Sequence, residues 1–173
     1  MVENDLAIEW CETQLVSKEL NLGQDDARCS LREQQVCHGF TDDEILYLEK
    51  YLEKRSYKAG EVIIRKGEVA NEIFFLLKGE TVVMMPLSTG KFKRLYTITD
   101  GMAFGEIPLV GLSTRIADII ASKKSECFVI NLENFEKLSQ EKPQLKEKFL
   151  TNLCRILFDR LRKANEEIAF LCR

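Results

Sequence analysis

An acid and an arginine stand close together in a segment that contains several glycines. Glu106 follows Gly105, and Arg115 lies ten residues beyond Gly105. An arginine keeps its charge at working pH, and its fork of donors matches phosphate oxygens. A carboxylate repels a phosphate but accepts hydrogen bonds from sugar hydroxyls. The run Phe104-Gly105-Glu106-Ile107 is typical of the start of a one-turn helix, whose free N–H groups attract an anion. The combination indicates a phosphorylated sugar.

Short β-rich runs surround this segment and must position it. They recur at intervals of about ten residues, are separated by glycines, and have no helical pattern between them that could form parallel crossovers. The sequence therefore predicts an antiparallel arrangement. The runs are 62–64, 73–77, 82–85, 95–98, 116–120 and 128–130.

Helical patterns precede and follow the strands. Apolar residues at helical spacing predict a helix over 5–20. Thr41 and Glu44 form a capping box, which predicts a helix from about 42 to 54. The fold class is therefore α+β, an antiparallel β-roll of the jelly-roll type flanked by helices. We expect a helix over 1–22, a linker over 23–40, the roll with its first helix over 41–140, and a long C-terminal helix over 141–173.

The C-terminal helix carries an apolar stripe that runs from Leu145 to Leu171 in steps of three and four. Residues 144–171 would span about 40 Å, which exceeds the diameter of a small roll. The stripe can pack back on the helices before the roll, or it can pair with a second copy in a homodimer. The sequence leaves both alternatives open.

Composition excludes several classes of protein. A chain of 173 residues suits one domain with a helical extension, and its net charge of −3 gives no general attraction to nucleic acid. A basic cluster near the C-terminus is interpreted as solvated surface; it comprises Arg155, Arg160, Arg162 and Lys163. We find no apolar run of roughly 18 residues and no signal peptide, so we expect a cytoplasmic chain that meets a membrane only through a parent segment.

Catalytic and metal-binding patterns are lacking in the sequence. His38 is the only histidine, and neither a nucleophile elbow nor a phosphate-binding Walker loop occurs. The six cysteines are scattered, which indicates reduced thiols rather than a metal site. The chain ends without room for a helix-turn-helix after the last helix. We therefore expect no enzyme, no metal and no DNA-binding role.

Five motifs follow one another along the chain. They are Ala59-Gly60-Glu61-Val62-Ile63, Lys66-Gly67-Glu68, Ile73 to Gly79, Phe104-Gly105-Glu106, and Arg115-Ile116-Ala117. Their order and spacing are specific, and the pattern over residues 59 to about 138 resembles the cyclic nucleotide-binding domain of the catabolite activator protein, cyclic-nucleotide-dependent kinases and gated channels.

The resemblance implies a cyclic nucleotide as ligand and a role for each matching residue. Phe104 begins the phosphate-binding cassette, the backbone N–H groups of Gly105 and Ile107 bind the cyclic phosphate, Glu106 binds the ribose 2′-hydroxyl, and Arg115 pairs with the phosphate. Ile116 and Ala117 close the cassette through backbone contacts, while Val83 and Leu95 form an apolar wall. Because Ile116 has no hydroxyl, cyclic AMP is favoured over cyclic GMP.

Three residues depart from the pattern of the family. Ile116 stands where many relatives have Ala, Ser or Thr, so a side-chain hydroxyl contact is lost there. Pro108 stands where a small residue is usual and removes one N–H. Asp118 replaces a common Thr or Ser and adds a negative charge near the cassette. Its effect depends on whether it faces the phosphate or solvent.

A second resemblance concerns the N-terminus. The run Asp5 to Glu12 is similar to the last helix of a STAS domain, as it precedes a cyclic nucleotide domain in some bacterial sulfate-permease-type (SulP) anion transporters and glutaminases. It implies a regulatory piece of a larger protein, with parent domains as partners and occupancy relayed through the C-terminal helices. The alternative is a structural or dimerising module of the same fold without ligand.

Overall fold

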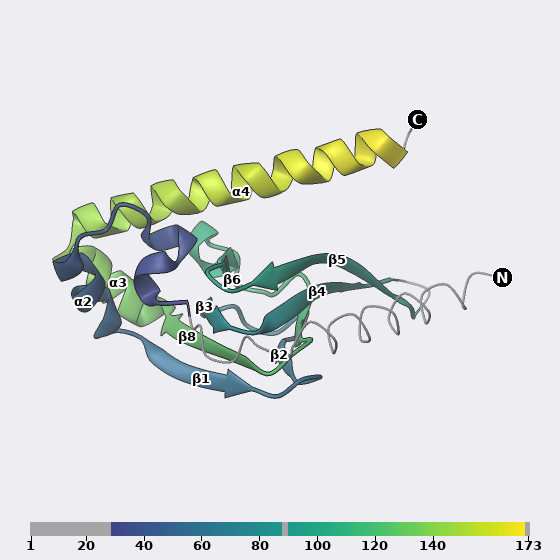
Figure 1. The fold of residues 1–173 in the computed structure, drawn as a ribbon, viewed down its shortest axis with the longest axis horizontal. Coiled ribbons are helices and arrows are strands. Elements are labelled where there is room, and N and C mark those ends of the chain that lie inside the picture. Colours follow the sequence, from purple (N-terminus) through teal and green to yellow (C-terminus); the bar gives the residue numbers. More distant parts are fainter. Residues whose placement is uncertain (1–28, 88–89, 172–173) are drawn as a thin grey trace, which may run out of the picture.

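The structure is a computed structural model that describes residues 29–87 and 90–171. Eight strands form a roll, and helices gather at one end of it and along one side (Figure 1). The helix expected over 5–20 lies outside the described residues.

Two four-stranded sheets, antiparallel throughout, build the roll and confirm the predicted fold class. One has the order β1-β8-β3-β6, with bounds Glu53–Tyr57, Ser125–Asn131, Glu72–Lys78 and Ala103–Phe104. The other has the order β2-β7-β4-β5, with bounds Val62–Ile64, Asp118–Ala121, Glu80–Pro86 and Phe92–Thr99.

The helices cover the outer face of the first sheet. Two short 3₁₀ helices, η1 and η2, precede α2. A third, η3, lies between strands β6 and β7 in the sequence. The capping box is confirmed, because Thr41 and Glu44 exchange side-chain to backbone hydrogen bonds at the start of α2. The bounds are η1 Leu31–Glu33, η2 Gln35–Cys37, α2 Asp42–Glu49, η3 Ile107–Val110, α3 Leu132–Glu141 and α4 Pro143–Leu171.

Strand β3 separates two apolar cores, which explains its almost uninterrupted apolar sequence. Phe74 faces the interior of the roll and stacks on Phe104, with ring centroids 5.0 Å apart. Phe75 belongs to the other core, where it meets Phe149 of α4 edge to face. Successive residues of a strand point to opposite faces, so a strand that is covered on both sides must be apolar at every step.

The structure differs from the expected elements at three places. The helix expected over 42–54 ends at Glu49, and residues 53–57 form β1, which pairs with β8. The short strand β6 was also missed. The segment expected as a linker over 23–40 includes η1 and η2 in its described part, and it buries Leu31, Val36 and Cys37 in the helical core. The ends of these elements depend on strand pairing and packing between residues far apart in the sequence, which local composition cannot predict.

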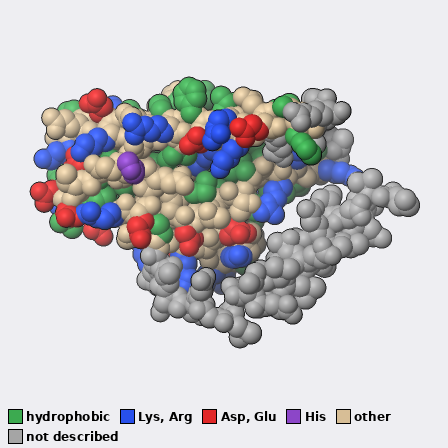
Figure 2. All heavy atoms as spheres, turned by 45° about the horizontal axis from the view of Figure 1, so that its top comes forward, with side chains coloured by type: hydrophobic (Ala, Val, Ile, Leu, Met, Phe, Trp, Pro, Cys, Tyr) green, Lys and Arg blue, Asp and Glu red, His purple; other side chains and the backbone are tan. Residues whose placement is uncertain are grey.

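The two halves of α4 differ in environment. Leu145, Phe149 and Leu153 are buried against the helical core, so the first half packs back on the preceding helices, as one alternative expected. Leu161 and Ile168, in the second half, are exposed by 57% and 58%. Figure 2 shows hydrophobic side chains among charged ones along this side of the molecule. Within the described part of the chain, no helix combines the length and apolar character of a membrane span.

Candidate functional site

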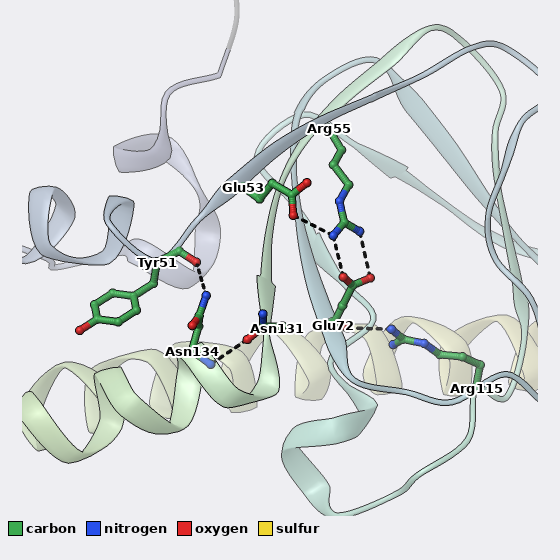
Figure 3. A network of polar contacts seen from close by, with 7 residues as sticks. All are labelled: Tyr51, Glu53, Arg55, Glu72, Arg115, Asn131 and Asn134. Carbon is green, nitrogen blue, oxygen red and sulfur yellow. Dashed lines mark hydrogen bonds and ion pairs between the residues drawn. The ribbon is translucent and has the colours of Figure 1, made fainter.

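Arg115 is a buried charge held by two carbonyl oxygens. It precedes β7 and is 6% exposed. Its Nη1 donates to Gly105 O at 2.9 Å, and its Nη2 donates to Glu72 O at 2.8 Å (Figure 3). The guanidinium also lies over the ring of Phe74, 5.9 Å from its centroid. Burial lowers the pKa of Arg115, while nearby glutamates oppose this shift. With five N–H donors in all, the side chain keeps donors for an anion.

An ion pair between Arg55 and Glu72 stabilises the start of β3, where the Glu72 carbonyl binds Arg115. The Glu72 carboxylate accepts two hydrogen bonds from Arg55, at 3.0 and 2.8 Å, and Arg55 also donates to Glu53 (Figure 3). Because the charge of Glu72 is directed to Arg55, only its backbone carbonyl binds Arg115. Arg115 is therefore positioned by dipoles, and no carboxylate of the described residues bonds it directly to cancel its charge.

Gly105 lets the backbone approach Arg115 closely. Its φ is +74°, in the region that favours glycine, and a Cβ there would lie 3.1 Å from Arg115 Nη1 and 3.1 Å from Phe74 Cδ2. Any larger residue would be strained and would crowd the guanidinium.

The one-turn helix expected after Gly105 is η3, and Glu106 is its N-cap. Pro108 is buried in its first turn, where a backbone N–H has no partner within the helix. Pro108 therefore fits the local structure, although it supplies no donor to an anion. Leu109 N donates to Glu106 O at 3.0 Å, which closes the turn.

A cavity of about 130 Å³ lies beside Gly105, Glu106 and Arg115. The structure brings together in its lining eight of the nine predicted site residues, and the ninth, Phe104, lies behind it in the roll core. Val83 is buried, whereas Leu95 and Ile116 are exposed by 43% and 56% and form part of the rim. The eight are Val83, Leu95, Gly105, Glu106, Ile107, Arg115, Ile116 and Ala117.

Asp118 is engaged by a turn. Its Oδ1 accepts a hydrogen bond of 2.7 Å from Lys66 N, in the loop between β2 and β3. The carboxylate of Asp118 therefore has a backbone hydrogen-bond partner in this loop.

Sequence reasoning missed five residues at this site, and three of them, Ile64, Met85 and Ile119, complete the apolar lining of the cavity. Tyr96 of β5 lines the cavity beside Leu95. Arg160 of α4, interpreted from the sequence as solvated surface, is only 18% exposed, and its Nη1 lies 3.6 Å from Glu106 Oε1. No local pattern could have revealed this contact, because the two residues are 54 positions apart.

Metal-binding geometry is not found in the described residues, where no three His, Cys, Asp or Glu side chains are grouped to hold an ion. The expectation of a metal-free domain remains a prediction. Arg115, Glu106 and the backbone around Gly105 are instead suited to an anion that carries hydroxyl groups.

Comparisons with known proteins agree on one family. The model of the cyclic nucleotide-binding domain matches residues 54–142. Glutaminase 1 of Bradyrhizobium diazoefficiens is 35% identical over 167 residues, covering 96% of this chain but 26% of the glutaminase. The chain thus spans about a quarter of the length of this relative.

Solved structures share the fold. The catabolite activator protein of Thermus thermophilus superposes with a TM-score of 0.69 at 24% identity, covering 80% of this chain and 63% of that one. A cyclic nucleotide-binding domain from Methylobacillus flagellatus gives a TM-score of 0.71 at 22% identity, covering 75% and 73%. At these identities the likeness concerns the fold alone.

Proposed function

This chain belongs to the cyclic nucleotide-binding domain family, and we propose that it is a non-catalytic regulatory domain that binds a cyclic nucleotide in the cavity beside Arg115. The observation that carries the proposal is the buried Arg115 guanidinium, which two carbonyl oxygens hold at a cavity also lined by Glu106. A buried arginine that no carboxylate in the described part of the chain bonds directly suits an anionic ligand.

The eight predicted residues that line the cavity have proposed roles. The ring phosphate pairs with Arg115 and accepts hydrogen bonds from the backbone of Gly105 and Ile107. Glu106 accepts a hydrogen bond from the ribose 2′-hydroxyl. The remaining contacts come from the backbone of Ile116 and Ala117 and from the apolar wall of Val83 and Leu95.

Cyclic AMP is the ligand that we favour over cyclic GMP. Support comes from Ile116, which follows Arg115 and offers no hydroxyl to a guanine, and from the apolar character of Val83 and Leu95. A titration of the same sample with both nucleotides compares their affinities directly.

The proposed role in a parent protein is to relay occupancy through α3 and α4. The likeness to Glutaminase 1, which includes residues outside the nucleotide-binding family match, supports a larger multidomain parent. A sulfate-permease-type anion transporter with a STAS domain remains the other proposed parent, on the N-terminal sequence alone. The cytoplasmic location stays a prediction.

Equilibrium calorimetry tests the proposed function. We expect saturable heat with one site per chain on titration with cyclic AMP, and weaker binding of cyclic GMP. The open nucleotide 5′-AMP is the matched control. It keeps the base, the ribose and a 5′-phosphate but lacks the cyclic phosphodiester, so it should bind more weakly than cyclic AMP. No heat with either cyclic nucleotide at millimolar concentration would overturn the proposal.

A structural or dimerising module is the second candidate, and two observations favour it. The cavity is smaller than the roughly 300–1,000 Å³ of typical small-molecule sites. One side of α4 also carries apolar or small residues in alternating steps of four and three, which is the spacing of a coiled-coil seam. The seam comprises Leu150, Cys154, Leu157, Leu161, Ala164 and Ile168. Leu150 and Leu157 are partly buried against the helical core, and the other members are exposed.

A homodimer through this seam is tested by its natural cysteine. In a parallel, in-register pair of α4 helices, Cys154 would face its counterpart, so mild oxidation should give a disulfide-linked dimer that Cys154→Ser abolishes. Leu161→Glu should yield a monomer in sedimentation velocity. A monomer at all concentrations in the unmodified protein would refute the dimer.

A further inference from the structure

Arg160 reaches from α4 back to the roll at the edge of the proposed nucleotide site. Its Nη2 donates to Ala103 O at 2.7 Å, next to the cassette. Its guanidinium lies over the Tyr96 ring, 5.4 Å from the centroid, and its Nη1 lies 3.6 Å from Glu106 Oε1. Tyr96 and Glu106 both line the cavity. One side chain of α4 therefore contacts two walls of the site.

The contacts of Arg160 are incomplete. Its Nε and Nη1 are buried and have no hydrogen-bond partner among the described residues. Buried donors without acceptors cost free energy, so a movement that brings the Glu106 carboxylate within hydrogen-bond distance of Arg160 is favoured. The 3.6 Å separation from Glu106 is an ion pair that is longer than a hydrogen bond, and a small movement of either side chain would close it.

Resting on the proposed binding of a cyclic nucleotide, we infer that Arg160 is a positioning residue that holds Glu106 for the ribose and thereby couples occupancy of the site to the position of α4. The role is exerted through the Glu106 carboxylate. One carboxylate has lone pairs enough to accept from Arg160 and from a sugar hydroxyl together.

The charges around the cavity indicate that Arg160 raises the affinity for the nucleotide. A cyclic phosphate carries one negative charge, and the Glu106 carboxylate in the same cavity repels it. Arg160 offsets that repulsion, and Glu106 and Arg160 are each only 18% exposed, so solvent screens the pair incompletely. Loss of the arginine leaves a poorly solvated carboxylate beside the phosphate. Arg160 therefore strengthens nucleotide binding, and by reciprocity a bound nucleotide strengthens the docking of α4.

A double-mutant cycle tests whether Arg160 acts through Glu106. Cyclic AMP affinity is measured by calorimetry for the unmodified chain, Arg160→Gln, Glu106→Gln and the double variant. We expect Arg160→Gln to weaken binding about tenfold, a value between those of exposed and buried charge pairs. In the Glu106→Gln background the same change should matter less than about twofold. Arg160→Lys, which keeps the charge, should retain most of the affinity.

The matched control is Arg162→Gln, which removes an arginine two residues further along α4. Arg162 pairs with Asp159 and Glu166 of the same helix, so affinity should not change. Hydrogen exchange supplies a second readout: cyclic AMP should slow exchange of the α4 amides around Arg160 in the unmodified chain but not in Arg160→Gln.

The outcomes separate this role from the proposed function. Equal losses for Arg160→Gln in both backgrounds, or no loss in either, would overturn the positioning role while leaving nucleotide binding intact. Absence of binding by the unmodified chain to cyclic AMP and cyclic GMP at millimolar concentration would overturn the proposed function and this role with it.

Discussion

Replacement of Arg115 by alanine should weaken cyclic nucleotide binding by about thirtyfold or more. Removal of one member of a desolvated charge pair costs about 2–5 kcal/mol, and 1.4 kcal/mol corresponds to tenfold in affinity. The lower end applies here, because Leu95 and Ile116 at the rim are partly exposed, so the phosphate keeps some of its water. Calorimetric titration with cyclic AMP measures the change.

The same substitution removes two hydrogen bonds inside the protein, to Gly105 O and Glu72 O. At about 1 kcal/mol each, their loss should lower the free energy of unfolding by about 2 kcal/mol, which urea unfolding checks separately. Arg115→Lys keeps the charge but cannot reproduce the fork, so its affinity should be intermediate. Arg162→Ala serves as the matched control. An affinity of Arg115→Ala within threefold of the unmodified chain would show that Arg115 is not the phosphate ligand.

Three further predictions concern stability and reactivity. Gly79→Ala should lower the free energy of unfolding by about 2 kcal/mol or more, because a Cβ there would lie 2.4 Å from a backbone oxygen. Gly67→Ala is the control and should cost less, because a Cβ at Gly67 meets nothing within 4 Å. Urea unfolding measures both variants, and equal midpoints would refute the prediction. Hydrogen bonds from two tyrosine hydroxyls lower the pKa of Glu141 below 4.5, so its contribution to stability is present above pH 4.5 and is lost as the pH falls further. Glu141→Gln should therefore lose less stability than the unmodified chain between pH 7 and pH 3.5 in urea unfolding, and an equal loss would contradict the linkage. Burial raises the pKa of Cys127 to about 12, so a short pulse of iodoacetamide at pH 8 should leave it unmodified while exposed Cys154 reacts, as peptide mass spectrometry would detect; comparable rates would refute the burial.

The sequence predicted strands from their apolar runs, and most of these strands bury side chains on at least one face. The apolar run in β3 is an example, because the roll core covers one face and the helical core covers the other. In β5, by contrast, only Ile98 is buried. Strand β1 escaped prediction because its residues are mostly polar and its place depends on pairing with β8, more than 65 residues later in the sequence. The expected helix over 42–54 ended early for the same reason, since residues from Glu53 onward pair in the sheet instead.

The candidate site divides in a similar way. Gly105, Glu106 and Arg115 lie in one short segment, so their types and spacing indicated a shared cavity, and the structure brings them together. The partners that hold them are distant in sequence: the carbonyl of Glu72 for Arg115, and Arg160 for Glu106. Arg160 lies in a basic cluster of the sequence, which suggested a solvated side chain. Its contact with Glu106 depends on the path of α4 across the roll, which local sequence does not report.

The most direct test of the nucleotide site is an amide NMR titration of the ¹⁵N-labelled chain with cyclic AMP. Saturable shifts should appear first at Gly105, Ile107, Ile116 and Ala117, which line the cavity, and the same titration of Arg115→Ala should need a far higher concentration. No saturable shift at millimolar cyclic AMP, or shifts confined to residues away from the cavity, would contradict the proposal that the ligand binds between Arg115 and Glu106.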